Sequence, residues 1–251
     1  MKRENFYIST IAPDAEEMAR KHGMGLEIAE FCAAYNMDMK FKDTDPVVKE
    51  KIAGVEKRVL HAPYSELFPC AIDPMVRDVA RYRYRQALKI AQDYGVTKVI
   101  IHGGYNPRIY YPIWYSEQSV VFWKEFLDVI PEGMEICLEN VLEEEPEMMI
   151  KIFEGIDSPK IRMCLDIGHV NFYSKLKVQQ WLERCTPFIS HFHIHNNDES
   201  WDTHSNLDEG TIPMKEVLEM IRTLCPDATY ALEVLKAEPA VKWLVKNGVI
   251  K

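Results

Sequence analysis

The feature of this sequence that most constrains its fold is an alternation of short β-branched or apolar runs with longer amphipathic stretches. Helical patterns separate the runs, for example at residues 15–22, 47–57, 74–94, 118–129 and 214–224. The strand-like runs are residues 6–12, 25–31, 59–64, 98–104, 134–141, 161–170, 189–197 and 229–235. Eight such βα units without a linker or low-complexity segment are typical of a closed parallel barrel. We therefore expect an α/β chain, a single (β/α)8 TIM barrel formed as one domain by residues 1–251.

Within the expected strands, apolar and polar residues alternate, so each strand should turn one face to the helices and the other to the barrel interior. In the run 134–141, for example, Ile136 and Leu138 share one face while Glu139 lies on the other. Placing Phe192 and Ile194 outward likewise turns the three histidines of the run 189–197 inward. The inward residues predicted near strand ends are His61, His102, Glu139, Asp166, His193, His195 and Glu233.

Composition and charge limit the class of protein. The chain is 47% hydrophobic and 27% charged, which is ordinary for a globular domain of 251 residues. A net charge of −9 disfavours nucleic acid and anionic membranes as partners, because both need a basic face, although it does not remove nucleic acid from consideration. The six cysteines are widely spaced and form no CxxC pair, which favours a reducing, cytoplasmic location. The first 14 residues resemble neither a signal peptide nor a membrane span.

Chemically active side chains gather at one end of the predicted strands. Seven of the eight histidines lie at or just past a strand end, together with Glu139, Asp166, Asp202 and Glu233. Barrel active sites form from residues at the carboxyl ends of the strands and from the loops that follow. Imidazole and carboxylate together suit zinc, manganese and related divalent ions. Because carboxylates in apolar strands are costly to bury unpaired, the sequence predicts a divalent-metal site at this end.

The ordered motifs of the chain resemble those of a known superfamily. They are HAPY (61–64), IHGG (101–104), LEN (138–140), LDIGH (165–169), HFHIHNND (191–198), DTH (202–204), DEGTI (208–212) and LEV (232–234). This set, which covers nearly the whole chain, is similar to the xylose isomerase-like TIM-barrel superfamily. That superfamily includes sugar isomerases, ketose epimerases and the endonuclease IV group of abasic-site nucleases, so the resemblance implies a metal-dependent enzyme.

The likeness to sugar epimerases implies one divalent metal ion held by Glu139, Asp166, His193 and Glu233. It also implies that Glu139 and Glu233 act as acid and base on opposite faces of a substrate carbon. His169 would contact a substrate oxygen, and His195, which shares its face with His193, is an alternative ligand. The first hypothesis is therefore an isomerase or epimerase of a small sugar, polyol or sugar phosphate.

The likeness to endonuclease IV implies a wider set of ligands, with up to three zinc ions that assist displacement at phosphorus. The additional positions are His61, His102, His169, Asp202 and His204, all of which this chain has. The metal content thus stays open between one and three ions of zinc or manganese. The second hypothesis is a zinc-dependent phosphoesterase, including an abasic-site endonuclease, and the third is a non-catalytic sugar-binding barrel.

Departures from the two patterns bear on this choice. Residues 194–204 contain no arginine, where the epimerase pattern usually places one that binds substrate. Residues 33–45 lack the arginine-bearing loop that the nucleases insert into DNA, and residues 143–145 are acidic, as in a solvated helix start. Phosphate repulsion at that acidic run disfavours abasic DNA as a substrate.

Three further residues are candidate substrate contacts. Glu27 points inward on the second strand, where a sugar contact and a core ion pair are both consistent with the pattern. Tyr64 ends the HAPY motif at the active end of the third strand. Trp114 belongs to the aromatic stretch 105–115, which suits a sugar-stacking platform or lid and equally an oligomer contact. A homo-oligomer is therefore left open.

Overall fold

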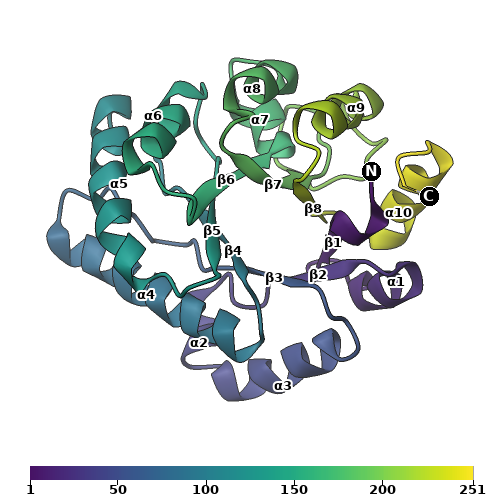
Figure 1. Cartoon of the computed structure of the whole chain (residues 1–251), viewed down its shortest axis with the longest axis horizontal. Coiled ribbons are helices and arrows are strands. Elements are labelled where there is room, and N and C mark those ends of the chain that lie inside the picture. The colour runs from purple at the N-terminus through teal and green to yellow at the C-terminus, as the bar shows by residue number, and fades with distance from the viewer. Residues whose placement is uncertain (251) are drawn as a thin grey trace.

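The computed structural model describes residues 1–250, in which eight parallel strands close into a barrel in chain order (Figure 1). The strands are β1 (Phe6–Ser9), β2 (Gly25–Ile28), β3 (Arg58–His61), β4 (Lys98–His102), β5 (Glu135–Glu139), β6 (Ile161–Asp166), β7 (Ile189–Ile194) and β8 (Thr229–Leu232). The first strand pairs with the last, which leaves no open edge among these strands. The predicted single (β/α)8 barrel is confirmed.

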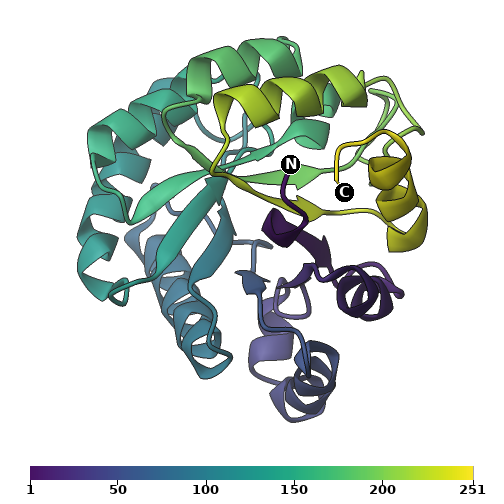
Figure 2. The same cartoon turned by 45° about the vertical axis from the view of Figure 1, so that its right-hand side comes forward.

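Helices surround the strands as an outer ring (Figures 1 and 2). They are α1 (Ala15–His22), α2 (Ala34–Met37), α3 (Phe41–Ile52), α4 (Pro74–Asp93), α5 (Pro112–Phe126), α6 (Glu147–Ile156), α7 (Ile167–Tyr173), α8 (Val178–Cys185), α9 (Met214–Leu224) and α10 (Ala237–Lys246), with short 3-10 helices η1 (Arg3–Asn5) and η2 (Leu127–Val129). Among the helices of residues 1–250, none combines the length and the apolar character that crossing a bilayer requires.

The predicted helices at 15–22 and 214–224 have the observed bounds, but several other boundaries were wrong. Residues 167–170 start α7 instead of extending a strand, because the Asp166 carboxylate accepts a hydrogen bond from His169 N (2.7 Å) and caps the helix. The helix predicted at 47–57 runs from Phe41 to Ile52. The helix start predicted at 143–145 is also wrong, because α6 begins at Glu147. Of the three acidic residues only Glu145 is exposed, while Glu143 is buried and accepts hydrogen bonds from Tyr115 Oη and Val141 N.

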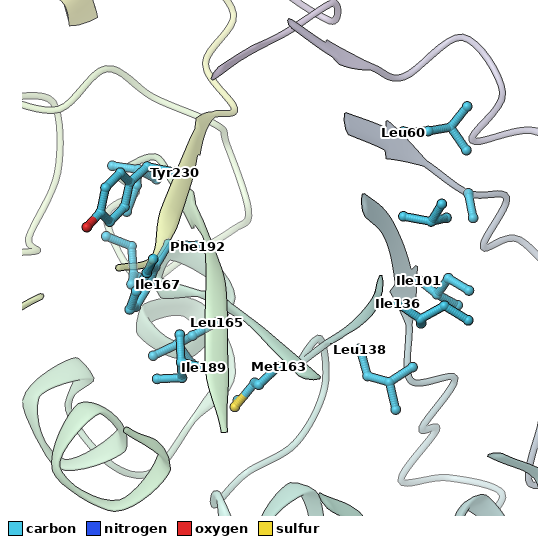
Figure 3. Packing of buried hydrophobic residues seen from close by; sticks show 14 of the residues in the cluster. Leu60, Ile101, Ile136, Leu138, Met163, Leu165, Ile167, Ile189, Phe192 and Tyr230 are labelled. Atoms are coloured by element: carbon cyan, nitrogen blue, oxygen red, sulfur yellow. The ribbon is translucent and has the colours of Figure 1, made fainter. Parts of the chain in front are cut away.

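The main hydrophobic core lies between the barrel wall and the helices. Leu60, Leu138, Leu165 and Phe192 point from their strands away from the barrel axis (Figure 3), as the alternation predicts. Inside the barrel, by contrast, Ile100, Cys137 and Cys164 form a separate small apolar cluster. The rest of the described interior is rich in polar side chains, so the strands turn polar side chains to the barrel interior and apolar side chains to the helices.

The first and last βα units are joined by a side chain. Asp14, in the loop after β1, accepts hydrogen bonds from Ala237 N (2.8 Å) and Glu238 N (2.9 Å) at the start of α10. Helix α1 packs against α10 at the same place, so the two ends of the chain meet where the barrel closes (Figure 1).

Candidate metal centre

Glu139, at the end of β5, lies at the middle of the polar cluster. Its Oε2 is 3.3 Å from both His61 Nε2 and His102 Nε2, and its Oε1 is 3.2 Å from His169 Nδ1 and 3.3 Å from His193 Nδ1. The whole residue is buried. One carboxylate thus gathers imidazoles from β3, β4, α7 and β7, which are far apart in the sequence.

Asp166 ends β6 and faces the same space. Its Oδ1 is 3.1 Å from His195 Nε2, and its Oδ2 is 3.5 Å from His169 Nδ1 and 3.6 Å from His193 Nδ1. The Asn140 side chain fixes the backbone of Asp166 by donating to its carbonyl (3.0 Å) and accepting from its N–H (2.9 Å). The ends of β5 and β6 are therefore held in register beside the carboxylates.

The loop between β7 and α9 brings two further residues into the cluster. Asp202 Oδ2 lies 3.2 Å from both His169 Nε2 and His204 Nε2. His204 Nδ1 also lies 2.8 Å from the carbonyl oxygen of Glu233, and Glu233 Oε2 is 3.2 Å from His193 Nδ1. Asp202 and His204 are therefore part of the cluster, although their backbone belongs to a loop.

Several overlapping groups of ligand atoms in the described residues are close enough to share an ion, among them His61, Glu139 and His193. Glu139, Asp166, His193 and Glu233, all buried, each offer one atom within 4.8 Å of the others. His195, His204 and Glu233 form a second group by the same measure. His193 thus belongs to the group with Glu139 and Asp166, whereas His195 belongs to the group with His204, and Glu233 is common to both.

The donor set fits a divalent cation. Within residues 1–250, Glu139, Asp166, Asp202 and Glu233 pair only with histidines, and no lysine or arginine lies within 4.0 Å of them. Several buried polar atoms of these described residues have no hydrogen bond, namely both oxygens of Glu139, Asp202 Oδ1, His193 Nδ1 and His195 Nδ1. Buried anions need a compensating positive charge, and carboxylate with imidazole is the ligand chemistry of zinc and manganese.

The surroundings push the pKa values of the two glutamates apart. Burial alone would raise the pKa of Glu139, but the charges of His102 and His193 outweigh burial and hold that pKa well below the usual range. Burial raises the pKa of Glu233 to about 6. A pair of carboxyls with opposite shifts is suited to separate roles as base and acid.

The predicted substrate contacts have different positions. Tyr64 is 43% exposed and stacks on His102 with ring centroids 4.4 Å apart, so its ring borders the mouth of the site. The Trp114 indole N–H donates to the carbonyl of Cys70 (2.9 Å) and anchors its loop. Glu27 is fully buried inside the barrel, where Oε2 lies 3.2 Å from His193 Nε2. Its partners are histidines, which agrees with the core ion-pair alternative for this residue.

Two residues that support the site were not singled out from the sequence. Asn140 braces Asp166, as described above, and its carbonyl oxygen also lies 2.9 Å from His169 Nδ1. Gly168 lies under His195, where a Cβ atom would come within 1.9 Å of the imidazole ring. The sequence signal for both is their place inside the motifs LEN and LDIGH, next to the ligands.

Comparisons with known proteins agree with the barrel fold described above. A family model described as "Xylose isomerase-like TIM barrel" matches residues 14–246. An uncharacterized protein of Methanocaldococcus jannaschii is 29% identical over 73% of this chain and 66% of its own length. A probable endonuclease 4 of Ureaplasma parvum is 23% identical over 72% of this chain and 66% of its own. The chain thus spans slightly less than two thirds of the length of these relatives.

Solved structures match over almost the entire chain. A D-tagatose 3-epimerase-like protein superposes with a TM-score of 0.79 and 25% identity, covering 99% of this chain and 97% of that one. The IOLI protein with a bound zinc atom superposes with a TM-score of 0.74 and 16% identity, at the same coverage of 99% and 97%. At that lower identity, the second likeness is one of fold alone.

Proposed function

Because the chain belongs to the xylose isomerase-like TIM-barrel family, we propose that it is a divalent-metal-dependent isomerase or epimerase of a small sugar or polyol. One observation carries the proposal: Glu139 and Glu233 lie 3.3 and 3.2 Å from the same atom, His193 Nδ1, and so border one small space. Two carboxyls around one space can remove a proton from a substrate carbon and return it.

The residues of the chain suit distinct steps of such a reaction. Glu139, whose pKa is low, is ionised and therefore free of a proton, and Glu233, with its pKa raised to about 6, can carry and donate one near neutral pH. Glu139, Asp166, Glu233 and either His193 or His195 would hold the ion, and His169 would contact a substrate oxygen. A bound divalent ion would polarise the carbonyl or hydroxyl next to the reacting carbon.

The side chains around the site suit a substrate with hydroxyl groups. The described site carboxylates and their histidine partners can accept from and donate to sugar hydroxyls. The likeness to the D-tagatose 3-epimerase-like protein supports the same class. A free sugar or polyol is therefore proposed ahead of a sugar phosphate. The cytoplasmic location and the homo-oligomer stay predictions.

Hydrogen exchange at carbon tests the proposal. The protein loaded with zinc or manganese is incubated in D2O with a panel of aldoses, ketoses and cyclic polyols, and deuterium at carbon is followed by NMR. We expect exchange with one member of the panel, reduced by about 10²–10⁴-fold in Glu233→Gln, because general acid–base catalysis contributes that much. Glu125→Gln, which changes an exposed carboxylate on α5 bound to Arg81, should keep the activity. Full metal loading without exchange in any member would contradict the proposal.

A specific observation favours a second candidate, a multi-metal phosphoesterase. The five additional ligand positions implied by the likeness to endonuclease IV lie close together. His61 and His102 contact Glu139, and His169 and His204 contact the fifth position, Asp202. Sites with two or three ions are typical of in-line displacement at phosphorus. The relatives named endonuclease 4 support this candidate as well.

Metal content per chain separates the two candidates. The protein is purified without chelator and analysed by elemental analysis, together with His204→Ala and with Lys177→Ala as an exposed control. About one ion, unchanged in His204→Ala, is expected for the mononuclear sugar enzyme. Close to three zinc ions, with a loss in His204→Ala alone, would place the phosphoesterase first.

A further inference from the structure

Below the metal centre, a row of polar side chains runs through the barrel interior from the amino-terminal ends of the strands to His193. Lys98 Nζ on β4 donates to Thr229 Oγ1 on β8 (3.0 Å), and Thr229 Oγ1 lies 2.6 Å from His191 Nδ1 on β7. His191 Nε2 is 3.5 Å from Glu27 Oε2 on β2, and the same oxygen is 3.2 Å from His193 Nε2. Both histidines and Glu27 are completely buried.

The chemistry of the groups limits where each hydrogen in this row can lie. A lysine ammonium can only donate, so Thr229 Oγ1 accepts from Lys98. Its own hydroxyl hydrogen has two acceptors within reach, His191 Nδ1 at 2.6 Å and the Ser190 carbonyl oxygen at 3.4 Å. The shorter contact favours His191 Nδ1 as the acceptor, and a histidine that accepts at Nδ1 carries its hydrogen on Nε2. That atom faces Glu27 Oε2 at 3.5 Å, a charge contact longer than a hydrogen bond. The opposite arrangement would turn the Nε2 lone pair of His191 toward a carboxylate.

The same carboxylate acts on His193 from below. Glu27 is acceptor-only when ionised, so the Nε2 atom that faces it carries the hydrogen. The Nδ1 atom of His193 is then the nitrogen that can exchange its proton for a bound cation, and it lies within 3.6 Å of Glu139, Asp166 and Glu233. Within residues 1–250 this buried Nδ1 atom has no hydrogen bond, which agrees with an atom that serves a ligand outside the protein.

We propose that Glu27 is a positioning residue that holds His193 in the tautomer protonated at Nε2, so that Nδ1 is presented to a divalent metal ion. The row Lys98–Thr229–His191 in turn holds Glu27 in place from below. Carboxylate–histidine–metal arrangements of this kind fix the ring and raise the basicity of the ligand atom. The inference rests on the metal site of the proposed function, and not on which reaction that site performs.

Zinc affinity measures the effect of Glu27. The metal-free protein and Glu27→Gln are titrated with zinc against a chromophoric chelator. We expect the variant to bind zinc about 10–100-fold more weakly, the usual effect of removing such a partner. Glu143→Gln is the matched control. Glu143 is also a buried carboxylate, in the loop after β5, but it accepts hydrogen bonds from Tyr115 and Val141 and not from a histidine. Affinity within twofold of the unchanged protein in a folded Glu27→Gln would overturn the proposal.

A second variant keeps the test open if Glu27→Gln does not fold. Thr229→Val preserves the shape of the side chain and all charges but removes the hydroxyl that orients His191. We expect a decrease of zinc affinity in the same direction and of smaller size, with the thermal stability of the metal-free protein measured alongside. An unchanged zinc affinity in a folded Thr229→Val would contradict the supporting role of the row Lys98–Thr229–His191.

The tautomer itself is observable. In the zinc-loaded, ¹⁵N-histidine-labelled protein, long-range ¹H–¹⁵N correlation NMR should show His193 protonated at Nε2 and metal-bound at Nδ1, with His193→Gln used for assignment. A carboxylate that merely filled space would leave this signature unchanged in Glu27→Gln. A hydrogen on Nδ1 of His193 in the loaded protein would overturn the proposal. These readouts need no substrate, so a failure of the proposed enzymatic activity leaves them interpretable.

Discussion

At the scale of single residues, the site depends on close approaches that only certain side chains allow. Glu139 is the shared neighbour of four imidazoles, and each of them comes from a different βα unit. His195 approaches Asp166 closely only because the residue beneath its ring, Gly168, has no Cβ. The geometry of the cluster is therefore set by small neighbours as well as by the ligands themselves.

Replacing Gly168 by alanine should displace His195. The added Cβ would lie 1.9–2.4 Å from three atoms of the imidazole, so the ring must move away from Asp166. We expect the free energy of unfolding to fall by about 1–3 kcal/mol, as for other overpacked sites, even though alanine favours a helix. Urea denaturation of the metal-free protein measures this loss, and a crystal structure shows the ring.

Gly155→Ala in α6 is the control for Gly168→Ala. There the three atoms nearest the added Cβ all belong to the Val120 side chain of α5, the closest at 2.5 Å, and none belongs to a proposed metal ligand. Zinc affinity should therefore fall in Gly168→Ala and stay unchanged in Gly155→Ala. Equal zinc affinities for the two variants would show that His195 does not depend on Gly168.

At the scale of elements, strand ends and helix starts are fastened to one another by side chains that accept backbone hydrogens. Asn140 joins β5 to β6 in this way, and Asp166 caps α7, which carries His169. Asp14 does the same across the closure of the barrel, where it caps α10 from the loop after β1. The amide hydrogens at the start of a helix lack partners within the helix, so such caps decide where it begins.

Asp14→Ala should weaken the closure between the first and last units. It removes two hydrogen bonds to the start of α10, and we expect a loss of about 0.5–2 kcal/mol in the free energy of unfolding, the range for lost caps. Thermal and urea denaturation measure it. Asp14→Asn, which keeps one acceptor oxygen, should lose less, and a loss in Asn equal to that in Ala would argue against the capping role.

At the scale of the whole molecule, the buried cluster couples stability to pH and to metal. Burial alone would lower the pKa of His204, but its hydrogen bond with Asp202 and the charge of Glu233 raise that pKa to about 9. A histidine whose pKa is raised by folding stabilises the folded chain fully below about pH 6.5 and loses that contribution as the pH rises through its folded pKa. His169 and His193 are shifted in the same direction.

The metal-free protein should therefore become less stable between about pH 7.5 and pH 9. Each proton that only the folded state holds lowers the free energy of unfolding by about 1.4 kcal/mol per pH unit in this range. His102 and His191, whose pKa values are lowered to about 3 and about 4, stay neutral there and do not oppose the trend. Urea denaturation of chelator-treated protein at several pH values measures the slope, and a stability that is flat from pH 7.5 to 9 would contradict it.

Zinc should reverse this dependence. Metal ions compete with protons for the same nitrogen atoms, and a ligand that binds only the folded state stabilises it by mass action. At saturating zinc we expect the melting temperature to rise and to hold or increase from pH 7.5 to 9. In the metal-free protein, His204→Ala should reduce the slope of the free energy of unfolding against pH, which would tie the pH dependence to this cluster.

The sequence by itself determined the architecture and the inward face of the strands. The period of two within each run places apolar residues against the helices, and this local pattern survives folding unchanged because burial of apolar surface enforces it. Residues that follow strand ends share the carboxyl end of a parallel barrel, so the convergence of Glu139, Asp166 and Glu233 also follows from the pattern. Boundaries such as 161–170 failed because a single cap at Asp166 turns the chain into α7.

Only the tertiary structure decided how the histidines are used. His191, His193 and His195 lie on the same face of their strand. Nevertheless, His191 contacts Glu27 and Thr229, His193 lies between Glu27 and the carboxylates of the metal centre, and His195 contacts Asp166. Their roles depend on Glu27, Thr229 and Gly168, which lie up to 166 residues away along the chain. Contacts at that separation are fixed by the closure of the barrel and by the space each neighbour leaves, and no local period of the sequence encodes them.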